Sequence, residues 1–213
     1  MNEFAAGIDR TKHPARRWIG IHGLVLAVLA IALTAPGCGS SDGASGGAPP
    51  DYERALAGAP PPLAALYDQG NELLPGGVDA YEERIAALRG YPVVVNVWAS
   101  WCGPCRFEFP HFQQAVTRYG TRVAFLGVDK QDSDDLAAAF LREEPVPYPS
   151  YTDPDEEIAE SVGDGGATRG LPATAFYDRG GEAVFLKLGP YSDEAELLAD
   201  VERYALGRGE KGG

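Results

Sequence analysis

Residues 93–110 read VVVNVWASWCGPCRFEFP, and this stretch decides the fold. The run that ends at Trp98 is apolar and rich in β-branched side chains, a pattern typical of a strand buried on both faces of an α/β sheet. A CxxC pair follows directly and we expect a helix after it. Cys102 then lies at a helix N-terminus, where free N–H groups and the helix dipole stabilise a thiolate. Cys105 lies one turn further along the same side, close enough to form a small disulfide.

The spacing of the two cysteines allows three interpretations: a redox-active pair, a structural disulfide or half of a zinc site. A closed zinc site needs four ligands, and the sequence contains no second CxxC and no HxxxH. A disulfide across this spacing closes too small a loop to constrain the chain much. We therefore predict that Cys102 and Cys105 form a redox-active disulfide, with no metal and no other cofactor.

The quoted stretch resembles the TlpA/ResA-like branch of the thioredoxin superfamily. A second stretch, GLPAT at 170–174, resembles the loop that holds the cis-proline of that superfamily. The resemblance covers about residues 71–207. It implies an α/β, thioredoxin-like three-layer fold, in which a central mixed sheet is flanked by helices. It also implies an extra strand–helix insertion before the cis-proline, Pro172.

Apolar spacing predicts the remaining elements. Before the quoted strand we expect a helix that includes Leu63, Leu66, Leu73 and Leu74, and a second helix from Val78 to Leu88 that stops at Gly90. After the quoted stretch we expect a strand at 122–129, a helix capped by residues 132–134, an extended segment at 148–151, a hairpin of 173–177 and 183–188, and a final helix capped by Ser192.

The position of Cys102 before the helix makes it the more exposed and more acidic thiol, so we predict that it is the nucleophile. Its thiolate attacks a disulfide of a client protein, and Cys105 resolves the mixed disulfide. The resemblance implies that Pro172 is cis, faces the CxxC pair and leaves the backbone of Leu171 free to pair with the client. Further client contacts are expected from the residues around the thiol, namely Trp101, Gly103 and Pro104.

The resolving step needs a proton acceptor near Cys105. Thioredoxin carries a buried Asp on the strand, six residues before the first cysteine, but this chain has Asn96 there, which cannot titrate. Glu108 matches the acidic residue of the TlpA/ResA-like pattern, and burial would raise its pKa toward neutrality. The alternative for Glu108 is a solvated helix carboxylate. His111 is interpreted as a surface or packing residue.

The N-terminus has the pattern of an export signal. Residues 10–17 are basic, residues 19–32 are almost wholly apolar, and small residues lead to Cys38, as in a bacterial lipobox, where lipid is attached to the cysteine. We predict a lipoprotein-type signal at 1–37 that is cleaved before Cys38. An uncleaved membrane-spanning anchor and plain secretion are the alternatives. All three place the folded part outside the cytoplasm, and the first two hold it at the extracytoplasmic face of the bacterial cell membrane.

Composition divides the rest of the chain and limits its partners. We predict a flexible tether at 38–60, N-terminal helices at 61–90, a thioredoxin-like core at 91–207 and a disordered tail at 208–213. The formal net charge of the 213 residues is −13, which repels phosphate backbones and argues against nucleic-acid binding. Residues 153–164 hold six acidic and no basic side chains, and form either a solvated face or a docking surface.

The Gly-Pro dipeptide between the cysteines adds no charge and resembles that of reducing thioredoxins, so we predict a protein disulfide reductase. The resemblance implies exported client proteins, such as apocytochrome c, and a membrane thiol reductant that supplies electrons. The N-terminal anchor in the lipid bilayer and the lack of any nucleotide-binding motif fit an externally recharged enzyme. We expect a monomer. The alternatives are a thiol peroxidase of the redoxin type and a copper-delivery or scaffold protein on the same fold.

Overall fold

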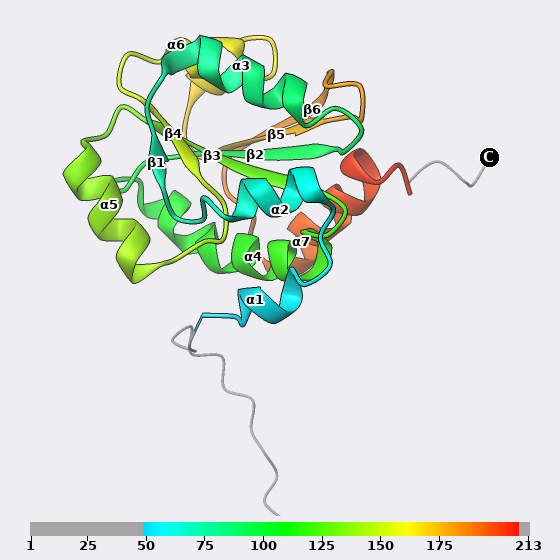
Figure 1. Ribbon diagram of the computed structural model, residues 1–213. Coiled ribbons are helices and arrows are strands. Elements are labelled where there is room, and N and C mark those ends of the chain that lie inside the picture. The colour runs from blue at the N-terminus through cyan, green and yellow to red at the C-terminus, as the bar shows by residue number, and fades with distance from the viewer. Residues whose placement is uncertain (1–48, 209–213) are drawn as a thin grey trace, which may run out of the picture. The chain divides into compact units, whose positions relative to one another are not determined.

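The computed structural model describes residues 49–208, and its centre is a mixed six-stranded sheet (Figure 1). The strands are β1 (Leu73–Leu74), β2 (Val93–Trp98), β3 (Ala124–Lys130), β4 (Ser150–Asp153), β5 (Ala173–Tyr177) and β6 (Ala183–Leu188). Their order in the sheet is β1-β4-β3-β2-β5-β6. The first four in this order pair in parallel, whereas β5 pairs antiparallel with both β2 and β6.

Helices cover both faces of the sheet, which gives three layers (Figure 1). Helices α4 (Gly103–Tyr119) and α7 (Glu194–Asp200) pack together against one face, and α3 (Gly77–Ala87) and α6 (Glu157–Ser161) against the other. The remaining helical segments are α1 (Tyr52–Ala55), α2 (Pro61–Tyr67), α5 (Asp134–Glu143), a 3₁₀ turn (Gly166–Arg169) and a π-helical turn (Val201–Ala205). The predicted thioredoxin-like fold is confirmed, and β4 followed by α6 forms a strand–helix unit before Pro172.

All six residues of β2 are buried, as the apolar run predicts for a central strand. Side chains of a strand alternate between faces, and the two hydrophobic clusters follow that period. Val94 and Trp98 belong to the cluster under α4, whereas Val93, Val95 and Val97 belong to the cluster under α3. The strand that precedes the CxxC pair is therefore fixed from both sides.

The helix predicted through Leu73 and Leu74 is wrong in its second half. Helix α2 ends at Tyr67, and Leu73–Leu74 is strand β1, which pairs in parallel with β4 at the edge of the sheet. Asn71 adopts a left-handed backbone conformation with φ of 66°, and its side chain binds the carbonyl of Leu141 and the N–H of Val146. These contacts turn the chain out of the helix and place the two leucines beside β4.

One helix start also differs from the sequence predictions. The cap of α7 is Asp193, which accepts a hydrogen bond from the N–H of Glu196, and not Ser192, which binds the carboxylate of Glu196 instead. Helix α5 begins as predicted, with Ser133 as its cap.

Helix α1 lies inside the range predicted as a flexible tether. Asp51 caps it, the Tyr52 hydroxyl donates to the carbonyl of Pro145, and Leu56 packs against the core. The folded part therefore begins before residue 61, because these contacts fix part of the range 38–60. The predictions for residues 1–37, for Cys38 and for most of the tail 208–213 lie outside the described residues. Among residues 49–208, no helix is long and apolar enough to cross a bilayer.

Candidate active site

Cys102 and Cys105 form a disulfide at the N-terminus of α4, with Cα atoms 5.2 Å apart. Cys102 is the N-cap of the helix, and its sulfur accepts a hydrogen bond of 3.2 Å from the N–H of Cys105. Helix N–H groups therefore point at this sulfur, which is the arrangement that stabilises a thiolate. Cys102 is 5% exposed and Cys105 is fully buried, so Cys102 is the sulfur that another molecule reaches first.

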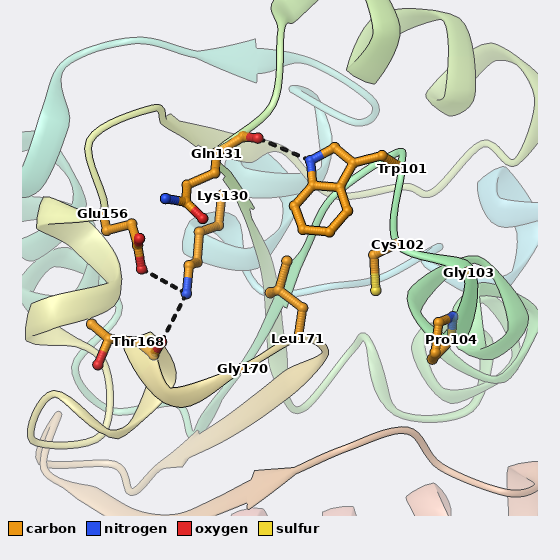
Figure 2. A pocket seen from close by; sticks show the side chains of 10 residues that line it. All are labelled: Trp101, Cys102, Gly103, Pro104, Lys130, Gln131, Glu156, Thr168, Gly170 and Leu171. Atoms are coloured by element: carbon orange, nitrogen blue, oxygen red, sulfur yellow. Dashed lines mark hydrogen bonds and ion pairs between the residues drawn. The ribbon is translucent and has the colours of Figure 1, made fainter.

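The Cys102 side chain borders an open cavity of about 410 Å³ (Figure 2). Trp101 stands beside it with 59% of its surface exposed, and its indole N–H donates to the carbonyl of Gln131. Four predicted client-contacting residues line this cavity, namely Trp101, Gly103, Pro104 and Leu171. The other lining residues besides Cys102 were not predicted from the sequence: Lys130, Gln131, Glu156, Thr168 and Gly170.

The Leu171–Pro172 peptide bond is cis, as the resemblance implied. The carbonyl of Pro172 accepts from the N–H of Gly189, whereas the backbone of Leu171 makes no hydrogen bond to any residue in 49–208. In Figure 2 the Leu171 side chain lies below the Trp101 ring and to the left of Cys102. A free backbone segment beside the reactive sulfur can pair with an extended polypeptide.

Glu108 lies one helical turn beyond Cys105 on α4 and is fully buried. Its Oε2 accepts a hydrogen bond of 3.0 Å from the N–H of Tyr191, and its Oε1 has no partner among the described residues. Burial raises the pKa of this carboxyl to about 8, although the Tyr191 N–H and the charge of Lys187 oppose the shift. The alternative of a solvated helix carboxylate is therefore wrong.

Asn96 is fully buried on β2, in register with Thr174 of β5. Within the described part of the chain, neither its amide group nor the hydroxyls of Thr174 and Tyr148 have a hydrogen-bond partner. Because an amide does not titrate, Asn96 cannot accept a proton from Cys105, whereas Glu108, one turn beyond Cys105, can exchange a proton near neutral pH. His111 packs edge-to-face on Phe107, with ring centroids 5.6 Å apart, and partial burial lowers its pKa.

The sequence analysis missed a second buried carboxyl, Asp129. It is the next-to-last residue of β3, lies opposite Trp98 and is only 2% exposed. Burial, and then the neighbouring Asp132, raise its pKa to about 8. Asp132 in turn accepts a hydrogen bond from the N–H of Ser100, so this acidic pair contacts the loop that carries the CxxC motif. An acid at the C-terminal end of a strand beside the CxxC strand was the signal that could have pointed to it.

A thioredoxin fold with a CxxC disulfide at a helix N-terminus and a cis-proline loop defines a thiol–disulfide oxidoreductase. No group of three or more His, Cys, Asp or Glu side chains within residues 49–208 is arranged to hold a metal ion.

Comparisons with known proteins agree with this class. The AhpC/TSA family matches residues 74–184, and the chain belongs to this family. It is 33% identical over 166 residues to the thiol:disulfide interchange protein DsbE of Escherichia coli. The matched region covers 76% of this chain and 83% of that protein. It is 30% identical over 141 residues to the thiol:disulfide interchange protein HelX of Rhodobacter capsulatus. This second match covers 66% of this chain and 72% of HelX.

A solved structure shares the fold at a similar level. The crystal structure of a candidate thiol:disulfide interchange protein DsbE from Chlorobium tepidum superposes with a TM-score of 0.51 at 26% identity, over 58% of this chain and 85% of that chain. With the Cys102–Cys105 disulfide, these similarities establish thiol–disulfide exchange as the chemistry of this family member.

Proposed function

We propose that this protein is a reductase of disulfides in exported client proteins, tethered at the extracytoplasmic face of the bacterial membrane. The observation that carries the proposal is the asymmetry of the disulfide. Cys102 borders an open cavity, and the fully buried Cys105 is followed one turn later by a buried carboxyl, Glu108.

In the first step, the Cys102 thiolate of the reduced protein attacks one sulfur of the client disulfide. A bond forms between Cys102 and the client, and the other client sulfur leaves as a thiolate that takes up a proton. The free backbone of Leu171 and the exposed ring of Trp101 support this step, because they can hold the client chain beside Cys102.

In the second step, Cys105 attacks the sulfur of Cys102 and releases the second client thiol. Cys105 must lose its proton first, and Glu108 is the acceptor in this proposal. Its raised pKa lets it take a proton from the thiol and later give it to the leaving client sulfur. The client gains two electrons and two protons, and the protein ends as the disulfide.

The direction of the reaction rests on the residues between the cysteines. Gly103 and Pro104 bring no charge that would stabilise the reduced form, which favours an electron donor over a strong oxidant. A dithiol protein of the membrane then has to reduce the Cys102–Cys105 disulfide after each cycle. Apocytochrome c before haem attachment is the client that the family resemblance suggests.

The test uses the full chain with either Cys102→Ser or Cys105→Ser in an insulin-reduction assay and in substrate trapping. We expect both variants to lose turnover, because each lacks one sulfur of the pair. Only Cys105→Ser should accumulate mixed disulfides with clients, because Cys102 still attacks but nothing resolves the product. Equal trapping by both variants would reject these roles, and peroxide turnover or copper binding by the wild-type protein would favour the alternatives.

The tether is tested by mass spectrometry of the wild-type protein purified from the membrane fraction. A lipid anchor predicts a chain that begins at Cys38 and carries the added mass of acyl chains, and Cys38→Ser should lack this mass and keep its leader. An intact N-terminus in the wild-type protein would instead favour a spanning anchor.

A further inference from the structure

The cavity beside Cys102 has one wall that thiol chemistry does not require (Figure 2). Lys130 is on this wall with its side chain only 4% exposed, and its ammonium group lies 2.7 Å from the Glu156 carboxylate. The same nitrogen donates to the carbonyls of Ala167 and Thr168, at 3.3 and 3.2 Å. An ammonium group has three donor hydrogens, so all of them are in use. Lys130 therefore offers no free donor to a molecule that enters.

The acceptors on the same wall remain available. Oε1 of Glu156 makes no hydrogen bond to any residue of the described part, and its side chain is 27% exposed. The exposed side-chain amide of Gln131 adds a carbonyl oxygen, together with an uncharged NH2 donor. A charged acceptor without a free charged donor favours a cationic guest over an anionic or apolar one.

The other walls suit the stem of a long cationic side chain. The exposed indole of Trp101, held by its bond to Gln131, and the side chain of Leu171 give apolar surfaces between Cys102 and Glu156. Lysine and arginine cover apolar surface with their methylene groups while the charged head reaches a polar site. An indole face also attracts a nearby cation.

The backbone at this wall is unusual as well. Gln131 and Glu156 both adopt left-handed conformations, with φ of 52° and 64°. Side chains other than glycine rarely adopt this conformation, and such positions cluster at ligand-binding sites. Two of them line one cavity here, on segments far apart in the sequence.

We propose that this cavity binds a lysine or arginine side chain of the client, next to the client cysteine that Cys102 attacks. This inference rests on the proposed function, because a client held on the backbone of Leu171 must pass the mouth of the cavity. Glu156 is then a specificity-determining residue, and it receives the charged head. The overall charge of −13 adds a general attraction for cationic segments, which the experiment has to separate from the subsite.

The experiment measures the rate at which the reduced full-length protein reduces three peptide disulfides. The peptides are identical except for the residue next to the cysteine, which is lysine, its uncharged isostere norleucine, or glutamate. We expect the lysine peptide to react about fivefold faster than the norleucine peptide at low salt, and the glutamate peptide to react slowest. The advantage of lysine should shrink at high salt.

The variant Glu156→Gln should abolish most of the lysine advantage, measured as the ratio of the lysine rate to the norleucine rate. Its amide oxygen still accepts from Lys130, so the buried ammonium keeps a partner. The matched control is Glu157→Gln, which removes the same charge from the next, exposed position and should keep the advantage.

Several outcomes would overturn the subsite while leaving the proposed function intact. These are equal rates for the three peptides with the wild-type protein, a preference for glutamate, or an equal loss of the advantage in both variants. If Glu156→Gln does not fold, a fourth peptide whose lysine lies several residues away from the cysteine decides with the wild-type protein. The subsite predicts that the advantage is lost with this peptide, whereas general attraction predicts that it remains. Failure to reduce any of the peptides would instead contradict the proposed reductase.

Discussion

Two buried carboxyls on the α4 side of the sheet have the same raised pKa, about 8, but different surroundings. The ionised form of Glu108 on α4 is disfavoured by the charge of Glu196. It is favoured by a hydrogen bond from a backbone N–H and by the cation of Lys187. The charges that raise the pKa of Asp129, near the end of β3, are those of three other acids, namely Asp132, Asp134 and Asp153. Burial is the main cause of both shifts, yet only Glu108 has donors that favour its ionised form.

The difference separates two kinds of buried acid. A proton-exchanging group must be stable in both charge states, and Glu108 has a donor ready for its ionised form, the Tyr191 N–H at 3.0 Å. Among residues 49–208 no donor hydrogen-bonds to Asp129, and the neighbouring Asp132 carboxyl raises its pKa further, so its surroundings favour the protonated form. We therefore propose proton transfer for Glu108 and a structural role for Asp129, which is linked to the CxxC loop through Asp132 and Ser100.

The largest expected effect is that of Glu108→Gln on turnover. Removal of the proton acceptor should slow the resolving step by about 10²-fold, because positioned acid–base groups contribute that much or more. The wild-type rate should rise with pH up to about 8, where Glu108 ionises, and this rise should disappear in the variant. Stopped-flow measurement of mixed-disulfide decay between pH 5 and pH 10 checks both points.

The matched variant for that experiment is Asp129→Asn, which removes the other buried carboxyl. Its rate should stay within about threefold of the wild-type rate. If both variants slowed turnover alike, the distinction between the two acids would be wrong.

A smaller effect is expected of Asp129→Asn on stability. The unfolded chain ionises this Asp near pH 4 and the folded protein near pH 8, so its contribution is full below pH 4 and lost as pH rises through 8. The variant, whose amide can still donate to Asp132, should differ least from the wild-type protein at pH 4 to 5. At pH 9 it should be more stable, by on the order of a few kcal/mol.

Urea unfolding of the oxidised proteins at pH 5 and pH 9 measures this difference. Glu108→Gln should behave in the same direction, because its folded pKa is also raised, from 4.5 to about 8. Stability and turnover together then distinguish the two acids. Both variants should be more stable than the wild-type protein at pH 9, but only Glu108→Gln should lose activity. A loss of stability at pH 9 in Asp129→Asn would contradict the acid pair.

The sequence predicted those parts of the site that a short segment determines. The buried strand, the cysteine spacing, the helix that follows and Glu108 all lie within residues 93–110. Asp129 was missed because its burial depends on the loop that carries Asp132 and on β2 beside it. The cavity was missed for the same reason, since residues from four separate segments line it. Strand β1 depends on Asn71 and on a partner strand far along the chain.

The smallest effect, and the most direct probe of the surroundings of Glu108, is expected of Lys187→Met. The charge of Lys187 favours the ionised form of Glu108, whereas the charge of Glu196 disfavours it. Lys187 and Glu196 also form an ion pair with each other, at 2.9 Å. Loss of the cation should therefore raise the pKa of Glu108 further and move the midpoint of the rate profile by about half a pH unit to the alkaline side. Lys187→Arg keeps the charge and should leave the midpoint in place. An unchanged or more acidic midpoint in Lys187→Met would mean that the proton acceptor of the resolving step does not sense Lys187. Glu108 would then be a buried acid like Asp129, and the contrast between the two would fail.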